Sequence, residues 1–365
     1  MKPTLRRFLG HSFMNRRCPR LSGWQRWLEG CSLAVFISTF PIFLRLSFCC
    51  LFSEVNSDMA QISGVLQVLL IISAAPLFGG LIKKIKNIVR MRRGAPVLQP
   101  YWNFLKLLGK NEEVISKHAS WLFKAAPYVV ISSSVAALLL LPLFGGSAAA
   151  GGMGDIVAVL FILALGRFFM ALAGMDAAGA FGGMGSSREM FISSLAEPAA
   201  LVSFFALAVN AGSTSFAAIA GNGAFSVSSL TAGFSLFIVT IAETSRIPVD
   251  NQETHLELTM VHEAMALEYS GRSLAIIEYA SHLRQLVWFS LIAGVIFPLP
   301  SPSGCGAALA AAAAVIFTLK LLALVIIMAF TEISLAKMRL FRVADLLMFA
   351  FIAALASAVL AAGGY

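Results

Sequence analysis

Long apolar runs alternate with shorter polar segments along most of the chain. A bilayer core of about 30 Å takes about 20 apolar residues per helix, and eight runs of this kind follow residue 59. Because the runs lack the strict alternation of a membrane barrel strand, we expect α-helices, which satisfy their own backbone hydrogen bonds in lipid. The pattern predicts an all-α, polytopic membrane protein, an eight-helix transmembrane bundle with helices near 62–82, 127–144, 156–174, 190–209, 228–243, 285–300, 307–331 and 342–361.

The first 58 residues are interpreted as a separate N-terminal extension, followed by a membrane domain over 59–365. A ninth apolar run, 31–52, lies in this extension and carries Pro41 and Arg45. Two interpretations remain open. The run is an additional membrane anchor, or translation starts at Met59 and the extension is absent from the mature protein.

The composition agrees with a membrane protein. Hydrophobic residues make up 59% of the chain and charged residues 12%, with a mean hydropathy of +0.85, whereas soluble domains carry about 25% charged residues. An ordinary soluble domain is therefore excluded, and the high hydrophobicity excludes intrinsic disorder. The five cysteines show no C-x-x-C pair or other metal-ligand spacing, so we expect no iron–sulfur cluster or zinc ion on this chain.

The net charge of +9 indicates the orientation of the chain in the membrane. Between the eight runs, every odd-numbered connection contains Lys or Arg and every even-numbered connection contains neither. The first connection, 83–126, is long and strongly basic, and the fifth, 244–284, is long too. By the positive-inside rule these long loops are cytoplasmic, which predicts a multi-pass protein of the cell inner membrane. The basic residues then mark the cytoplasmic face and no nucleic-acid site.

Acidic residues gather at the fifth connection. Seven of the 18 acids of the chain fall within it or at its edge: Glu243, Asp250, Glu253, Glu257, Glu263, Glu268 and Glu278. Carboxylates pressed against a membrane interior have raised pKa values through desolvation and mutual repulsion, which suits them to passing protons. A solvated amphipathic connector is the other interpretation that these residues leave open.

Two histidines of the same connection, His255 and His262, are seven residues apart. On a straight helix that spacing is about 10.5 Å along the axis, too far for both to bind one metal ion. We therefore expect a docking or proton-relay role for them, with ordinary hydrogen-bonded histidines as the simpler alternative.

A few charged residues lie inside the apolar runs. Glu197 falls about two turns inside the fourth run, and an intramembrane carboxylate is a candidate functional group. Arg167 and Lys320 are each expected to pair with an acid inside the bundle, and Lys320 is the stronger functional candidate because Arg167 could extend to the cytoplasmic interface. The glycines of 182–185 are expected to turn the chain between two helices, with Glu189 opening the second.

The fifth connection resembles a known family. Ala242-Glu-Thr-Ser-Arg-Ile-Pro-Val-Asp250, followed by Glu257 and by Glu268-Tyr-Ser-Gly271, is similar to the signature loop of the respiratory complex I subunit 1 family. Residues 254–265 look like the hydrogenase-4 component C and formate hydrogenlyase subunit 4 branch. The resemblance covers about 59–363, with further matches in Arg92-Arg93-Gly94, Val97-Leu-Gln99, Lys106-Leu-Leu108 and Ala336–Val343.

This resemblance implies an integral membrane subunit of a complex I-like, energy-converting [NiFe] hydrogenase or formate hydrogenlyase complex. Such a subunit anchors the hydrogenase module and couples its redox chemistry to proton translocation. It carries no cofactor itself, because the [NiFe] centre and the iron–sulfur clusters belong to its partners: the hydrogenase large and small subunits and an iron–sulfur subunit, beside antiporter-like membrane subunits.

Resemblance and buried charges together give the expected site residues. A proton path is expected at Glu197, Glu243, Asp250, Glu253, Glu257, Glu263, Glu268 and Lys320. Loop or docking roles are expected for Arg246, His255, His262, Arg93 and Gln99.

Some features depart from the quinone-binding members of the family. His255 falls where those members carry another acid, and the spacing from Glu243 to Glu268 is longer. The first connection also lacks the Gly-Pro-Asn motif of the quinone entrance. These departures favour the hydrogenase branch, with a quinone-binding subunit of an NADH:quinone oxidoreductase as the first alternative and a free-standing secondary transporter as the second. The motifs of this chain specify neither the electron donor, formate or another, nor the coupling ion.

Overall fold

The computed structural model describes residues 58–92, 94–112, 119–142, 154–221, 226–250, 261–296 and 307–364. Over these residues the chain is helical, and the one extended pairing among them is an isolated bridge between Asp155 and Ser215. The helices are α2 (Asp58–Val89), α3 (Gln99–Leu108), α4 (Trp121–Leu140), α5 (Ile156–Asp176), α6 (Ala180–Ala211), α7 (Phe216–Gly221), α8 (Val227–Glu243), α9 (His262–Ala266), α10 (Gly271–Ile296), α11 (Ala307–Ser334) and α12 (Leu340–Ala362).

The predicted all-α membrane architecture is confirmed. Each of the eight apolar runs lies largely within one long helix, namely α2, α4, α5, α6, α8, α10, α11 and α12. Six of these (α2, α4, α5, α6, α11 and α12) are long and apolar enough to cross a membrane, while α8 is a shorter apolar helix. The first fourteen residues of α10 contain Arg272, Glu278, His282 and Arg284, which lowers the hydropathy of the helix. The count of eight membrane spans therefore stays a prediction, and the run 31–52 lies outside the described residues.

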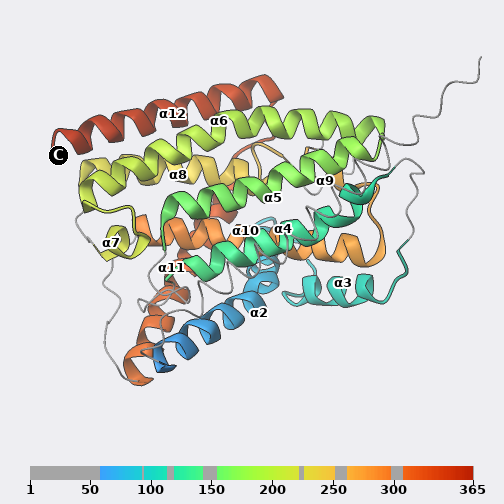
Figure 1. Cartoon of the computed structure of the whole chain (residues 1–365), viewed down its shortest axis with the longest axis horizontal. Coiled ribbons are helices and arrows are strands. Elements are labelled where there is room, and N and C mark those ends of the chain that lie inside the picture. Colours follow the sequence, from blue (N-terminus) through green and yellow to red (C-terminus); the bar gives the residue numbers. More distant parts are fainter. Residues whose placement is uncertain are drawn as a thin grey trace, which may run out of the picture. The chain divides into compact units, whose positions relative to one another are not determined.

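Helix α10 is at the centre of the bundle. It contacts α2, α3, α4, α8 and α11, while α6 packs against α5, α8 and α12 (Figure 1). The interior-facing Trp288, Phe289, Leu283 and Leu286 of α10 are almost fully buried. Because helices in a membrane bundle are held by close packing of their side chains, α10 is a fixed element against which the loops before and after it are positioned.

Local sequence signals explain several helix ends. Ser226 and Ser229 form a reciprocal capping box at the start of α8, which satisfies backbone N–H groups that have no partner within the helix. Gly212 ends α6 in the left-handed conformation, with φ of 64°, where glycine carries no steric penalty. Ser120 caps α4, and both its N–H and its hydroxyl donate to Asp176 at the end of α5, which joins these two helices.

The expectation that Gly182–Gly185 turns the chain is wrong. These residues lie inside α6, which begins at Ala180, and the turn comes earlier, at Ala178 with φ of 54°. A Cβ atom at Gly182 would lie 2.6 Å from the carbonyl oxygen of Gly174 on α5, and one at Gly185 would lie 2.9 Å from that of Val261. The glycines therefore allow close packing between helices, and Glu189 comes to lie well inside α6.

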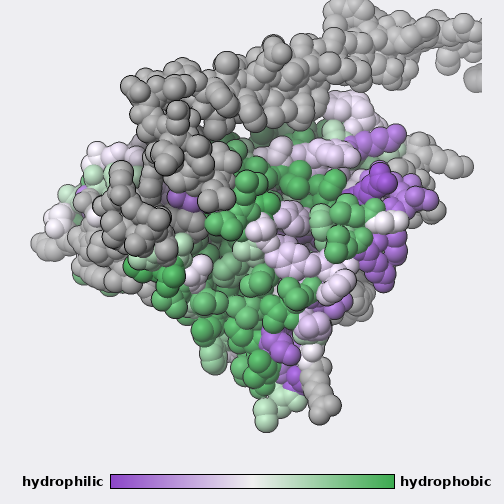
Figure 2. Space-filling model, turned by 90° about the horizontal axis from the view of Figure 1, so that it is seen from below, coloured by the Kyte–Doolittle hydropathy of each residue, from purple (hydrophilic) through white to green (hydrophobic). Residues whose placement is uncertain are grey.

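The polar first connection contains a helix that the run pattern did not predict. Helix α3 is amphipathic and follows the end of α2, with Pro100 in its first turn. Figure 2 views the molecule from the side on which α2, α3 and α11 lie lowest in Figure 1. Hydrophobic residues cover the middle of this face, and hydrophilic residues gather at the right-hand end, toward which α3 runs in Figure 1.

Candidate functional site

The loop that follows α8, residues 244–250, is buried along its whole length. Its backbone turns on itself: the N–H of Arg246 donates to Ile241 O, and the N–H groups of Val249 and Asp250 donate to Arg246 O. Ser245 adopts φ of 49°. These bonds satisfy the buried backbone groups within the loop itself. The side chains of Arg246 and Asp250 bond with other elements.

Asp250 joins three segments of the chain. One carboxylate oxygen accepts the backbone N–H of Val261 at 2.9 Å and that of His262 at 3.4 Å, and the other pairs with Lys337 Nζ at 3.0 Å. A second bond supports the same arrangement, because the N–H of Met338 donates to Pro248 O at 2.9 Å. Asp250 thus fixes the loop to the start of α9 and to the connection between α11 and α12.

Arg246 belongs to a buried cluster that we call the Glu332 cluster, made of Lys86, Arg246, Gln285 and Glu332. Arg246 donates to Glu332 at 3.2 Å and to the side-chain oxygen of Gln285 at 2.7 Å, and Lys86 Nζ lies 2.7 Å from the second oxygen of Glu332. The side chain of Glu332 is 1% exposed. A carboxylate in so apolar a site is stabilised by its cations, and removing one partner would leave an uncompensated buried charge.

A second cluster, the Arg167 cluster, consists of Arg167, Ser193, Glu197 and Glu243. Arg167 of α5 forms a close ion pair with Glu243 at the end of α8, and its other guanidinium nitrogen lies 2.8 Å from Ser193 and 3.5 Å from Glu197, both on α6. Arg167 and Glu243 are almost completely buried, whereas the side chain of Glu197 is 41% exposed. The expectation that Arg167 pairs with an acid is confirmed, and its extension to the interface is wrong.

Glu189 and Arg284 connect the Arg167 cluster to the loop. Glu189 on α6 and Arg284 on α10 are both buried. The charge of Glu189 acts on Arg167, Glu243 and Arg284, and Asp250 acts on Glu189 in turn. Since opposite charges interact strongly inside a protein, the acids and guanidinium groups form one electrostatic network from Glu197 to the loop.

His262 ends this network on the α9 side. Its Nε2 lies 3.1 Å from Arg284 Nη2, and because a guanidinium only donates, Nε2 accepts and the ring proton is on Nδ1. Burial, and then the charges of Arg284 and Arg167, lower the pKa of His262 from 6.5 to about 3. The ring is therefore neutral near pH 7. Nδ1 has no hydrogen-bond partner within the described part of the chain.

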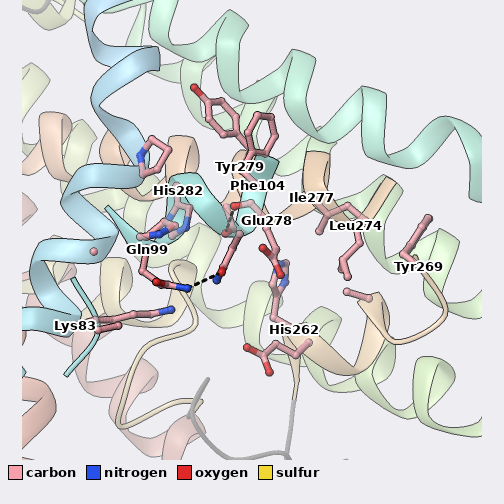
Figure 3. Close-up of a pocket in the computed structure, with 18 of the residues that line it drawn as sticks. Lys83, Gln99, Phe104, His262, Tyr269, Leu274, Ile277, Glu278, Tyr279 and His282 are labelled. Carbon is pink, nitrogen blue, oxygen red and sulfur yellow. Dashed lines mark hydrogen bonds between the residues drawn. The ribbon is translucent and has the colours of Figure 1, made fainter. Parts of the chain in front are cut away.

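A cavity of about 440 Å³ lies on the same side, between α2, α3, α9 and α10 (Figure 3). Both charged and apolar side chains line it. Lys83 reaches it from α2, and Gln99, which donates to Asn103 at 3.0 Å, reaches it from α3. The remaining polar lining comes from α9 and α10, with His262, Glu263, Glu278, Ser281 and His282. His262 thus contacts the Arg284 side of the network and the cavity at once.

A smaller cavity, about 20 Å³, lies at the other end of the network, where Arg167, Glu197, Glu243 and Trp288 are among its lining residues. This volume is enough for one water molecule. The indole N–H of Trp288 is buried and has no hydrogen-bond partner within the described residues, so polar groups from three helices and one indole donor converge on this point.

The structure brings together some of the predicted residues. Arg246, Asp250, His262, Glu243 and Glu197 lie along the two clusters and the network between them. Glu263 and Gln99 line the larger cavity instead. The predicted residues Glu253, Glu257, His255 and Arg93 lie outside the described residues.

Two other predicted residues are elsewhere. Glu268 is partly buried beside the start of α6, where a Cβ at Gly179 would lie 2.8 Å from its carboxylate, and a helix N-terminus favours a negative charge. Lys320 is partly buried on α11, twelve residues before Glu332, which is about 18 Å along the helix axis. Lys320 is therefore remote from the Glu332 cluster.

Sequence reasoning missed Glu332, Lys86, Glu189, Arg284 and Gln285 as site residues. All five lie within, or at the edge of, a long helix and are buried. The sequence offered one signal for these residues: each is a polar side chain within one or two helical turns of the end of an apolar run. No group of three His, Cys, Asp or Glu side chains is positioned to hold a metal ion in the described ranges.

Comparisons with known proteins agree on the kind of chain this is. A family model described as NADH dehydrogenase matches residues 62–362. Hydrogenase-4 component C of Escherichia coli (strain K12) is 32% identical over 281 residues, which cover 75% of this chain and 87% of that protein. Formate hydrogenlyase subunit 4 of the same organism is 30% identical over 287 residues, covering 77% and 92%. In the structure of the membrane-bound sulfane sulfur reductase, an archaeal respiratory membrane complex, one chain has the same fold, with a TM-score of 0.69 at 20% identity, covering 83% of this chain and 99% of that one.

Proposed function

The chain belongs to the NADH dehydrogenase family of complex I subunit 1-like membrane proteins, and we propose that it is the membrane subunit of an energy-converting [NiFe] hydrogenase complex of the formate hydrogenlyase type. In this role it anchors the hydrogenase module at the cytoplasmic face of the inner membrane and couples hydrogen chemistry to proton translocation. The electron-carrying centres reside in the partner subunits. Two relatives that are components of hydrogenase-4 and formate hydrogenlyase support this assignment.

The network from Glu197 to His262 is the observation that carries the proposed proton function. Three carboxylates, Glu189, Glu197 and Glu243, share the two guanidinium groups of Arg167 and Arg284. With all of them ionised the group has one excess negative charge, and His262 is neutral. One bound proton would neutralise this excess charge. Such a group can accept and release a single proton.

The 244–250 loop provides the link between this network and the rest of the protein. Arg246 enters the Glu332 cluster, while Asp250 holds the start of α9, where His262 contacts Arg284. A force on the loop would therefore change both the position of a cation and the surroundings of His262. We propose that the docked hydrogenase module acts on this loop, and that the protonation of the carboxylates responds to it.

Glu197 supports a role for a membrane partner. It lies on α6, one of the helices long and apolar enough to cross the bilayer, and its side chain is 41% exposed. A charged side chain facing lipid near the middle of a bilayer costs about 2.5–3.5 kcal/mol even on the lower scales. We propose that an antiporter-like membrane subunit covers this side of α5 and α6 and receives the proton from Glu197.

Affinity purification tests the assignment. The full chain, tagged at its C-terminus and expressed in its own host, should be extracted in mild detergent with hydrogenase large and small subunits, an iron–sulfur subunit and hydrogen-dependent redox activity. Extraction of the intact chain alone, under conditions that keep other membrane complexes together, would contradict it.

The larger cavity favours one alternative, a quinone-binding subunit. Its volume of about 440 Å³ and its mixture of apolar walls with polar side chains suit a lipophilic molecule that has a carbonyl head group. The two functions differ in a measurable way. If purified complex reduces a soluble quinone analogue with NADH, and Gln99→Ala with His262→Ala abolish this, the quinone assignment replaces ours. If hydrogen turnover continues and no quinone is reduced, the hydrogenase assignment stands.

A further inference from the structure

Helix α3 has two apolar faces, and only one of them is packed against the part of the protein that the structure describes. Tyr101 and Phe104, three residues apart, share the packed face. The hydroxyl of Tyr101 donates to Ser73 O on α2, and the ring of Phe104 lies 4.9 Å from that of Tyr279 on α10. Leu98, Trp102 and Leu105 share the other face at helical spacing, and they are 52%, 63% and 59% exposed.

The contacts of α3 fix its direction relative to α10. Phe104 meets Tyr279, whereas Glu112, beyond the end of α3, accepts from Ser273 in the first turn of α10. The helix therefore runs antiparallel to the first turns of α10. Its start packs on α2 at Gly80, where a Cβ atom would clash with Val97 O, and from there the Tyr101 side chain reaches back to Ser73 O. Gly80 lies three residues, about 4.5 Å along the axis, before Lys83, the first basic residue of α2. The start of α3 is thus on the membrane side of that basic segment.

Charge changes along α3 in the same direction. The exposed apolar residues occupy its first two turns, and the exposed Lys106 and Lys110 follow at its end. In Figure 2 this end of the molecule is where hydrophobic residues give way to hydrophilic ones. Tryptophan is enriched at membrane interfaces, and lysines near such an interface attract the anionic phospholipids of the cytoplasmic leaflet.

We infer that the exposed face of α3, defined by Leu98, Trp102, Leu105, Lys106 and Lys110, binds anionic phospholipid in the bilayer interface. The acyl chains contact Trp102 and Leu105, and the head group phosphate lies beside the two ammonium groups. This contact holds α3, and with it the α3 wall of the larger cavity, at a fixed depth. The inference does not depend on the hydrogenase assignment, because it concerns lipid alone.

Photo-crosslinking in the assembled protein tests it. The variant Trp102→p-benzoylphenylalanine, purified with whatever subunits accompany the chain, is placed in vesicles of equal phosphatidylglycerol and phosphatidylcholine, illuminated and analysed by mass spectrometry. We expect phospholipid adducts at position 102, with phosphatidylglycerol favoured on the order of tenfold. The double change Lys106→Gln with Lys110→Gln should reduce that preference to near parity while lipid adducts remain. Glu112→p-benzoylphenylalanine, beyond the end of α3, is the control and should give few lipid adducts.

Three results would overturn the inference. Adducts at position 102 that join the chain to a partner subunit would show that a protein covers this face. Equal labelling of the two lipids by the Trp102→p-benzoylphenylalanine variant that keeps both lysines would show that this face has no preference for anionic lipid. Equal lipid labelling at positions 102 and 112 would show that α3 presents no particular face to the bilayer.

Discussion

Arg246 in the loop after α8 and Glu332 near the end of α11 are 86 residues apart in sequence, and their side chains meet in the protein interior at 3.2 Å. Lys86 of α2 occupies the other oxygen of the same carboxylate at 2.7 Å. One carboxylate therefore pairs with two cations, Lys86 on α2 and Arg246 in the loop. This arrangement holds the 244–250 loop against α2, α10 and α11.

Removal of that carboxylate should destabilise the subunit. We expect Glu332→Gln to lower the free energy of unfolding by about 3–5 kcal/mol, because Lys86 and Arg246 would remain buried without a counterion. The melting temperature of the detergent-purified protein measures this effect. Glu112→Gln, at an exposed position in the first connection, is the matched control. Equal melting temperatures for the two variants would contradict the proposed contribution of Glu332 to the free energy of unfolding.

Asp250 should control the order of the segment that carries His262. Asp250→Asn weakens acceptance from the N–H groups of Val261 and His262 and removes the pair with Lys337. A hydrogen bond to a charged group contributes about 1.5–3 kcal/mol, so we expect amide exchange in residues 261–266 to accelerate by about ten- to a hundredfold. Hydrogen–deuterium exchange mass spectrometry measures this. Lys337→Gln keeps the two backbone bonds and should have a smaller effect. Equal acceleration in both variants would show that the pair with Lys337, and not the two backbone bonds, keeps residues 261–266 ordered.

The depressed pKa of His262 predicts a pH dependence of stability. Its folded-state pKa is about 3 and its ordinary value is 6.5, so the unfolded chain takes up the proton first. The contribution of His262 to stability is therefore complete above pH 6.5 and is lost as the pH falls toward 3, by up to about 1.4 kcal/mol for each pH unit. Melting temperatures between pH 7.5 and pH 5 measure it.

The variant His262→Gln provides the comparison for that pH series. Glutamine still accepts a bond from Arg284 but does not titrate, so its melting temperature should fall less steeply with acid. If the wild type and the variant show parallel curves, the ring of His262 is not held neutral in the folded protein.

The charge pattern of the connections predicts their sides of the membrane. In a background without native cysteines, Lys110→Cys reports on the first connection and Ser213→Cys on the fourth. An impermeant thiol reagent added to right-side-out cells should label position 213 and reach position 110 only in inverted vesicles. The reverse pattern would contradict the orientation, and labelling of both positions from the same side would contradict the span count.

The sequence predicts more of the fold than of the site. The long apolar runs set the helices, because a membrane segment must both be apolar and bond its own backbone. Residues Glu243, Arg246, Asp250 and His262 could be selected as well, since they lie within the motif-bearing fifth connection or at its edge. Their partners Glu332 and Lys86 could not be selected, because they lie on helices whose packing against the loop cannot be inferred from spacing in the sequence.

Individual residues show where the pattern misleads. Glycines at 182–185 suggest a turn, but they occur in α6 because Gly174 and Val261 pack too closely for a Cβ atom. Arg167 seemed able to reach the interface, yet Glu243 on another helix pairs with it. Helix α3 was not predicted, because ten residues with one packed and one exposed apolar face do not form a membrane-length run. In each case the deciding contact is made by a residue distant in sequence.

The central claim is that the carboxylate network moves protons through Glu197. Its most direct test is hydrogen-driven proton uptake by the complete complex in sealed proteoliposomes, followed with a pH-sensitive dye beside the rate of hydrogen turnover. We predict that Glu197→Gln assembles and turns over hydrogen but transports no protons, while Glu197→Asp, which keeps a titratable group, retains part of the transport. Proton uptake by Glu197→Gln at the wild-type rate would contradict the account.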